Sequence, residues 1–180
     1  LKVQEILVGL HSMFLRLDMT EKSVEKFIVY AKANNKLKSR GYQELADIEV
    51  LRGHLKKAKE LYEKAKTLGD PNGIAKATLE EFPEQVDSTE RQPLNPNTLF
   101  INPINALNRK GEIFAHFGMY QRAMGIYSMV LRMNPTNLTA LLNTATANYE
   151  NEKYNRAISI LERLFIIHPN HEHVIAHRLL

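Results

Sequence analysis

Two consecutive stretches of equal length decide the fold: INALNRKGEIFAHFGMYQRAMGIYSMVLRMNPTN at residues 104–137 and LTALLNTATANYENEKYNRAISILERLFIIHPNH at residues 138–171. A shift of 34 residues brings seven identities into register: Ala106/Ala140, Leu107/Leu141, Tyr120/Tyr154, Arg122/Arg156, Ala123/Ala157, Ile126/Ile160 and Pro135/Pro169. A fixed period of about 20–50 residues is typical of solenoid proteins, which stack like supersecondary units. The sequence therefore predicts an array of repeats.

Each unit is predicted to be a pair of antiparallel helices. In the first unit, Leu107, Gly111 and Phe114 are spaced to share one helical face, and a second apolar stripe runs over residues 120–131. Gly118 separates the two stripes and favours the left-handed backbone that ends a helix. A proline then stops the second helix of each unit, because its ring is incompatible with a helix interior. Small residues are expected where the two helices approach closely: Gly111, Ala145, Ala123 and Ala157.

This pattern resembles the tetratricopeptide repeat, a family motif of bulky, small and aromatic residues over about 34 positions. The first unit matches it at Leu107, Gly111, Phe114, Gly118, Tyr120, Ala123, Tyr127, Val130 and Pro135. The second unit departs from it at Asn148, where a large residue is usual, and at Glu152, where glycine is usual. Tyr149 is expected to supply the missing aromatic contact. The resemblance implies an all-α fold, a right-handed superhelix of antiparallel helical hairpins, here with a long insert loop.

Composition is that of a folded protein, with 180 residues, 44% hydrophobic, 24% charged and a net charge of +4. Lysines and acids alternate along the chain, which indicates solvated helix faces, and no basic stripe with interleaved aromatics predicts nucleic-acid binding. The absence of cysteine excludes disulfides. We expect no membrane span, no signal peptide and a cytoplasmic location. Because the chain begins with Leu1, we expect a fragment or processed form.

Three regions are predicted. Residues 1–71 hold two hairpins, a degenerate one with helices at 1–17 and 21–33, capped by Asp18 or Thr20, and a better match with helices at 41–52 and 55–68. Residues 72–103 form an insert, with a short helix at 73–82 and then a loop rich in proline and asparagine. Residues 104–180 hold the two repeats and the start of a third.

The insert loop has two interpretations. Loops longer than about 12–15 residues are uncommon in compact domains and tend to be functional or disordered. The loop around 83–103 is predicted to be a strap packed against the side of the solenoid, or alternatively an internal ligand that gates the groove.

Catalysis is not predicted. Glycine-rich phosphate loops and nucleophile elbows are absent from the sequence, and the carboxylates read as surface charge. Four histidines cluster near the C-terminus, at positions 168, 171, 173 and 177. His173 and His177 have the i, i+4 spacing of a zinc pair, but they lack the intervening glutamate of metalloproteases, and we expect no metal and no cofactor.

The resemblance to the tetratricopeptide repeat implies a concave groove lined by the first helix of each hairpin. We expect the partner-binding residues to be Asn105, Asn108, Arg109, Glu112, His116, Thr139, Leu142, Asn143, Thr146, Tyr149, His173 and His177, continued upstream by Gln43, Glu44, Asp47 and Val50. A family variant clamps a C-terminal carboxylate with lysine and arginine. Here Asn108, His173 and His177 stand at those positions, and this recognition is therefore not expected.

Two functional hypotheses follow from these residues. The first is a non-catalytic scaffold or adaptor that binds a peptide or partner helix in the groove. The alternative is a structural module that self-associates, or packs in a larger complex, through uncapped ends.

Overall fold

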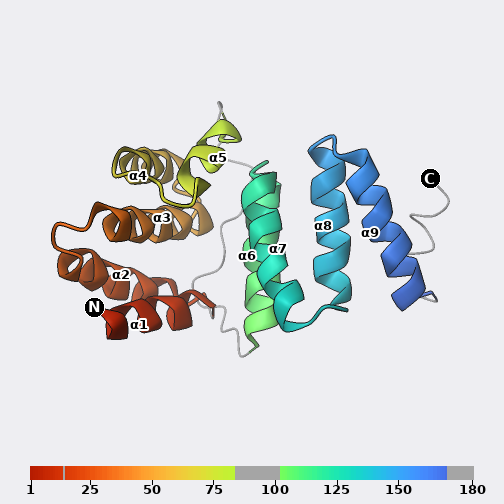
Figure 1. Cartoon of the computed structure of the whole chain (residues 1–180), viewed down its shortest axis with the longest axis horizontal. Coiled ribbons are helices and arrows are strands. Elements are labelled where there is room, and N and C mark those ends of the chain that lie inside the picture. The colour runs from red at the N-terminus through yellow and green to blue at the C-terminus, as the bar shows by residue number, and fades with distance from the viewer. Residues whose placement is uncertain (14, 84–101, 170–180) are drawn as a thin grey trace.

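A computed structural model describes residues 1–13, 15–83 and 102–169 of the chain (Figure 1). Within these ranges the structure contains nine α-helices and no strand. The helices are α1 (Lys2–Met13), α2 (Leu17–Tyr30), α3 (Asn35–Leu51), α4 (Leu55–Thr67), α5 (Ile74–Glu80), α6 (Pro103–His116), α7 (Tyr120–Met133), α8 (Leu138–Glu150) and α9 (Tyr154–Ile167). The predicted all-α architecture is confirmed.

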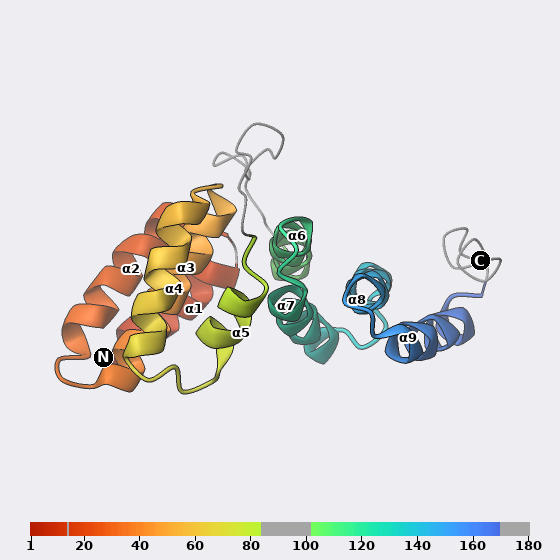
Figure 2. The ribbon, with the colours of Figure 1, turned by 90° about the horizontal axis from the view of Figure 1, so that it is seen from above.

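Consecutive helices pair into four hairpins: α1 with α2, α3 with α4, α6 with α7 and α8 with α9. Neighbouring hairpins then contact each other through α2 against α3 and α7 against α8. In Figure 2, α6 and α8 lie on one side of the row, and α7 and α9 lie on the other. This is the solenoid of helical hairpins that the repeat predicts.

All four hairpins turn through one residue in the left-handed conformation. This residue is Leu15, Gly53, Gly118 or Glu152, with φ of 51°, 81°, 80° and 56° respectively. In each turn its N–H donates to the carbonyl three residues earlier, and the next N–H donates to the carbonyl five residues before that donor. The left-handed turn expected at Gly118 is therefore present, and two non-glycine residues adopt it elsewhere.

The first hairpin differs from its predicted boundaries. The helix expected at 1–17 ends at Met13, and α2 begins at Leu17, because the chain reverses through left-handed Leu15. Asp18 and Thr20 are not the cap: both lie inside α2, and the Thr20 hydroxyl donates to the Arg16 carbonyl.

The helix predicted from residue 41 also begins earlier, at Asn35. The side chain of Asn34 accepts a hydrogen bond from the N–H of Leu37 at 3.1 Å, which satisfies one of the free donors of the first turn.

Close approach of the paired helices occurs at Gly111, one of the positions where it was predicted. A Cβ built on Gly111 would lie 2.3 Å from the ring of Tyr127, so α6 meets α7 with no room for a side chain at this position. Ala145 holds the position of Gly111 in α8, and Ala123 and Ala157 hold a second pair of equivalent positions in α7 and α9. All three alanines are buried.

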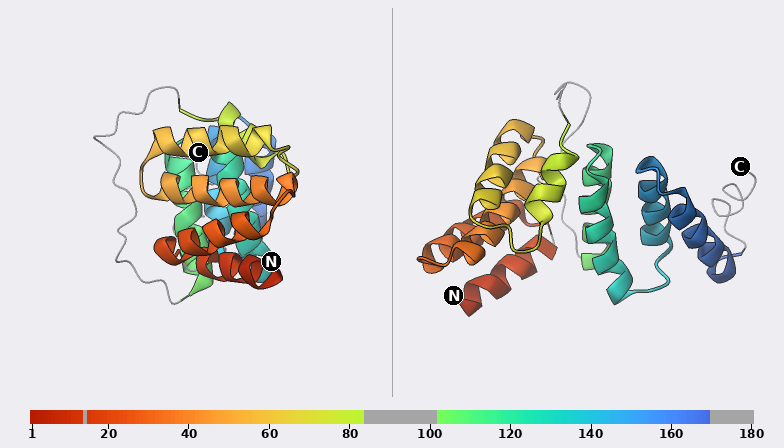
Figure 3. Two further views of the ribbon diagram at one scale, coloured as in Figure 1. Left: turned by 90° about the vertical axis from the view of Figure 1, so that its left-hand side faces the viewer. Right: turned by 45° about the horizontal axis from the view of Figure 1, so that its top comes forward.

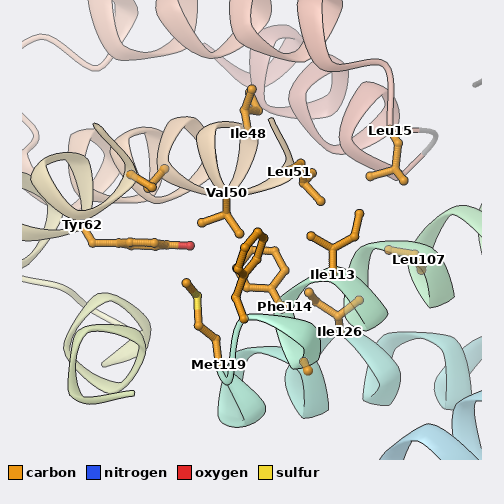
Figure 4. Packing of buried hydrophobic residues seen from close by; sticks show 14 of the residues in the cluster. Leu15, Ile48, Val50, Leu51, Tyr62, Leu107, Ile113, Phe114, Met119 and Ile126 are labelled. Atoms are coloured by element: carbon orange, nitrogen blue, oxygen red, sulfur yellow. The ribbon is translucent and has the colours of Figure 1, made fainter. Parts of the chain in front are cut away.

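One hydrophobic core crosses the boundaries of the three predicted regions. Figure 4 shows Val50 and Leu51 of α3 facing Phe114 and Met119 of the α6–α7 hairpin. Each of these four side chains is at most 1% exposed. Residues far apart in sequence therefore share one packed interior.

The succession of hairpins is irregular between α4 and α6. The short helix predicted at 73–82 is present as α5, which packs between α4 and α7 (Figure 3, right). Helix α6 contacts α3 and α1, and the helices on the two sides of this join run in clearly different directions in Figure 1. The strap predicted around 83–103 and the third unit predicted from 172 lie almost wholly outside the described residues. No helix in the described ranges is both long and apolar enough to span a bilayer.

Candidate functional site

The first helices of the two strong repeats, α6 and α8, lie side by side and present polar side chains. We call the surface that these two helices form together the α6–α8 surface. Six of the predicted binding residues are exposed on it and three are half-buried: Asn105, Arg109, His116, Thr139, Thr146 and Tyr149, then Glu112, Leu142 and Asn143.

A chain of polar contacts connects the two helices. Asn143 donates through Nδ2 to Glu112 Oε1 at 3.4 Å, and Glu112 Oε2 accepts from Arg109 Nη1 at 3.2 Å. The buried hydroxyl of Tyr127 also bonds Asn143, and burial raises the pKa of this tyrosine well above its ordinary value. The centre of the surface therefore offers amide, carboxylate and guanidinium groups held in place by one another.

Asn108 is not exposed as expected. Its side chain is 6% exposed and donates to Asn137 Oδ1 at 3.2 Å. Asn137 is the N-cap of α8, because the same oxygen accepts from the N–H of Ala140 at 2.9 Å. Asn108 thus positions the start of α8, and it lies beneath the surface that a partner would contact.

Tyr149 does not supply the core contact that the sequence suggested. It is 60% exposed and packs edge-on against Tyr154 of α9, with ring centroids 5.4 Å apart. Asn148 itself occupies the buried position and donates to the Thr144 carbonyl at 2.8 Å. Tyr149 is therefore an aromatic side chain available at the C-terminal end of the α6–α8 surface.

The predicted binding residues His173 and His177 lie outside the described residues, as does His171. His168 is described, and its Nε2 lies 2.9 Å from the Thr136 carbonyl. Among the described residues, no group of three or more histidine, cysteine, aspartate or glutamate side chains is placed to hold a metal ion.

The four upstream positions do not continue the α6–α8 surface. Gln43, Asp47 and Val50 are buried and Glu44 is half-buried, because α6 packs against this part of α3. Gln43 donates to Asp70 Oδ1 at 2.8 Å. The expected groove residues therefore do not continue from α6 into α3, across the irregular part of the solenoid between α4 and α6.

Asp47 instead forms a buried polar cluster that the sequence did not reveal. Its side chain is fully buried and accepts from the Tyr62 hydroxyl at 2.6 Å, from Lys110 Nζ at 2.8 Å and from the Arg122 guanidinium. Burial alone would raise the pKa of Asp47, but Arg122 and Lys110 outweigh this and lower it from 3.8 to about 2. The cluster joins α3, α4, α6 and α7 through charge-assisted bonds.

A cavity of about 350 Å³ lies beside this cluster, between α1, α3, α6 and α7. Lys110 and Arg122 form part of its wall. No pattern in the sequence predicted it, since its sides come from segments about a hundred residues apart.

Comparison with known proteins identifies the repeat. Residues 139–171 match the family model described as tetratricopeptide repeat. Residues 139–171 therefore form a tetratricopeptide repeat. A search of curated proteins gave no match. Among solved structures, the chain is similar to YrrB, described as a TPR protein with an unusual peptide-binding site, with a TM-score of 0.42 and 20% sequence identity over 96% of this chain and 89% of that one.

Proposed function

We propose that this protein is a non-catalytic scaffold that binds a peptide or partner helix on the α6–α8 surface. The observation that supports this most directly is the set of exposed amide, hydroxyl and guanidinium side chains that α6 and α8 present side by side. Such groups hydrogen-bond the backbone and polar side chains of an extended segment.

The chemistry of the surface divides into two parts. Arg109 and Asn143, connected through Glu112, supply donors and acceptors near its centre. Tyr149 supplies a large exposed ring at one end, and aromatic residues are frequent hot spots of binding energy. We therefore expect a partner with an apolar side chain near one end and a polar segment beside it.

A pull-down with matched variants tests this function. The site variant combines Arg109→Ala, Asn143→Ala and Tyr149→Ala. Its control replaces three exposed residues of α9, at Arg156→Ala, Ser159→Ala and Glu162→Ala. Proteins recovered by wild type and control but lost from the site variant are the expected result. Identical recovery by all three proteins would contradict the assignment.

A second candidate function is assembly through the ends of the row of hairpins. Helix α1 exposes Val3, Ile6 and Leu10 at 50–69%, and α9 exposes Ile158 at 53% and Ile166 at 79%. Exposed apolar helix faces at the ends of a solenoid are suited to stacking on further helices. Light scattering across a concentration series tests self-association. A wild-type mass that rises with concentration, and an Ile6→Lys, Ile158→Lys variant that stays monomeric, would support it, whereas a constant monomer mass for wild type would contradict it.

A further inference from the structure

The turn that joins α2 to α3 projects at the end of the molecule opposite α9 (Figure 1, Figure 2). Helix α2 packs on α1 and α3, and its residues Val24 and Phe27 are buried in the cluster that these helices share. The opposite face of α2 is exposed beside the turn. We call this face and the turn the α2–α3 corner, which consists of Lys22, Lys26, Val29, Tyr30, Lys32, Lys36 and Lys38.

The α2–α3 corner has an excess of positive charge. Although lysines alternate with acids elsewhere, residues 22–38 contain five lysines and one acid, Glu25. Four of the lysines are exposed and Lys38 is half-buried. Within the described part of the chain, none of the five forms an ion pair. These side chains are therefore free to contact an anionic partner.

Acids from the neighbouring helices do not cancel this charge. Glu5 of α1 is paired with Arg40 at 2.8 Å, and Glu21 of α2 with Arg52 at 2.7 Å. Residues 1–70 as a whole hold 14 lysines and arginines against ten aspartates and glutamates. The first two hairpins therefore remain positive, and the unpaired lysines of the α2–α3 corner are part of this excess.

Apolar side chains project from the same place. Val29 is 73% exposed and Tyr30 is 54% exposed. Helical spacing places Val29 on one face with Lys22 and Lys26. Exposed apolar residues bordered by lysines are typical of surfaces that bind anionic bilayers, because the apolar groups enter the interface while the ammonium groups contact lipid headgroups.

Backbone hydrogen bonds fix the position of the turn. The N–H of Ala31 donates to the Phe27 carbonyl at 2.9 Å, and the N–H of Asn34 donates to the Ala31 carbonyl at 2.8 Å. The side chain of Asn34 then caps α3 by accepting from the N–H of Leu37. Docking through the α2–α3 corner therefore requires little ordering of the backbone.

The shape and the residue types favour a membrane over a nucleic acid. The corner projects outward, and none of its residues lines the cavity beside Asp47. Single-stranded nucleic acids bind in charged grooves, whereas a bilayer presents a flat surface. Residues 22–38 contain no arginine, the residue that most often reads bases in duplex DNA.

We propose that the α2–α3 corner docks this protein on the surface of an anionic phospholipid bilayer. Val29 and Tyr30 enter the headgroup region, and the lysines around them contact the phosphate and carboxylate groups of the lipids. Helices α8 and α9 lie at the opposite end of the row, so the α6–α8 surface stays available to a protein partner.

Vesicle flotation of the full chain tests the charge requirement. One set of vesicles is phosphatidylcholine alone, and the other includes about one-third phosphatidylserine. The charge variant combines Lys26→Gln, Lys32→Gln and Lys36→Gln. Its control, Lys56→Gln, Lys59→Gln and Lys76→Gln, removes the same charge from exposed lysines of α4 and α5.

We expect wild type to bind the serine-containing vesicles at least about tenfold more tightly than phosphatidylcholine vesicles. The charge variant should lose at least about tenfold in affinity for the anionic vesicles, and the control should stay within about threefold of wild type. Raising the salt concentration should weaken binding, because exposed charges are screened.

A second pair of variants tests the apolar contact. Val29→Ser combined with Tyr30→Ser should weaken binding to anionic vesicles by about fivefold or more, because the apolar area that enters the interface is lost. The control, Ile158→Ser with Tyr149→Ser, replaces exposed apolar side chains of the α8–α9 hairpin and should bind like wild type. Since all substituted positions are exposed, the unfolding midpoints should stay close to that of wild type.

Three results would each overturn the proposal: equal binding of wild type to the two kinds of vesicle, equal binding of the charge variant and its control, or wild-type binding by the Val29, Tyr30 variant. Binding of a short DNA duplex that the charge variant loses, without binding to vesicles, would also overturn it, because the α2–α3 corner would then recognise nucleic acid.

Discussion

Arg122 and Arg156 occupy the same position of two consecutive repeats and lie in opposite environments. Arg122 is 14% exposed at its side chain and pairs with fully buried Asp47, whereas Arg156 is exposed. Both follow the same left-handed turn and belong to the second helix of a hairpin. The difference arises from the neighbours, because the α6–α7 hairpin packs against α3 on its far side and α8–α9 has α7 as its neighbour. Repeat register thus determines the backbone position of a residue, and the adjacent hairpin determines its burial.

The side chains inside the α6–α7 and α8–α9 hairpins also differ. Phe114 is fully buried against α3, and its counterpart Asn148 is buried with a hydrogen bond to its own helix. The α6–α7 hairpin also has Gly111 in contact with the Tyr127 ring, at the position where the α8–α9 hairpin has Ala145. The interior of the α6–α7 hairpin is therefore more closely packed than that of the α8–α9 hairpin.

The largest expected effect separates the two arginines. Arg122→Ala should lower the free energy of unfolding by about 3–5 kcal/mol, because it leaves Asp47 buried with part of its counter-charge removed. Arg156→Ala should change it by no more than about 0.5 kcal/mol, as is usual for exposed residues. Urea unfolding followed by circular dichroism measures both values. Equal losses would show that burial and the pairing with Asp47 do not make Arg122 more important for stability than exposed Arg156.

Titration of Asp47 gives a second test of the same contrast. Its folded pKa of about 2 lies below the unfolded value near 3.8, so its contribution to stability is complete above pH 3.8 and is lost as the pH falls through 2. The difference corresponds to about 2 kcal/mol. Carbon NMR of the Asp47 carboxyl should show no protonation until well below pH 3.8. A midpoint at 3.8 would mean that Lys110 and Arg122 do not hold this carboxylate.

Small residues at the contact between helices provide the next comparison. Gly111→Ala should cost about 1–3 kcal/mol, because the new Cβ would overlap the Tyr127 ring. The reverse change in the second repeat, Ala145→Gly, should cost about 0.5–1 kcal/mol through helix propensity alone. Thermal unfolding of both variants gives the comparison. If Gly111→Ala were neutral, the close approach of α6 and α7 would not be limiting.

Much of the fold could be predicted because the repeats of one chain can be aligned with each other. The period located the hairpins, Gly118 located a turn, and Gly111 located a close contact. The start of α2 was missed because Leu15, and not glycine, takes the left-handed position there.

The Asp47 cluster and the cavity were missed for a different reason. Arg122 is 75 residues from Asp47 in sequence, and no periodicity relates them. The contacts between α3 and the α6–α7 hairpin depend on which hairpin packs against which. Aligning one repeat with another does not show this. The α6–α8 surface was more accessible to prediction, because it follows from positions within single repeats, although Asn108 proved to be buried under it.

The smallest expected effect concerns the turns of the two hairpins. Glu152 has φ of 56° where Gly118 has 80°, and a left-handed backbone costs a non-glycine residue roughly 1–2 kcal/mol. Glu152→Gly should therefore raise the free energy of unfolding by about 1 kcal/mol. Glu162→Gly is the matched control, since it makes the same chemical change at an exposed position inside α9, where glycine should cost about 1 kcal/mol. Urea unfolding of both variants should show changes of opposite sign. A loss of stability in Glu152→Gly would show that the side chain of Glu152 contributes more than its backbone conformation costs.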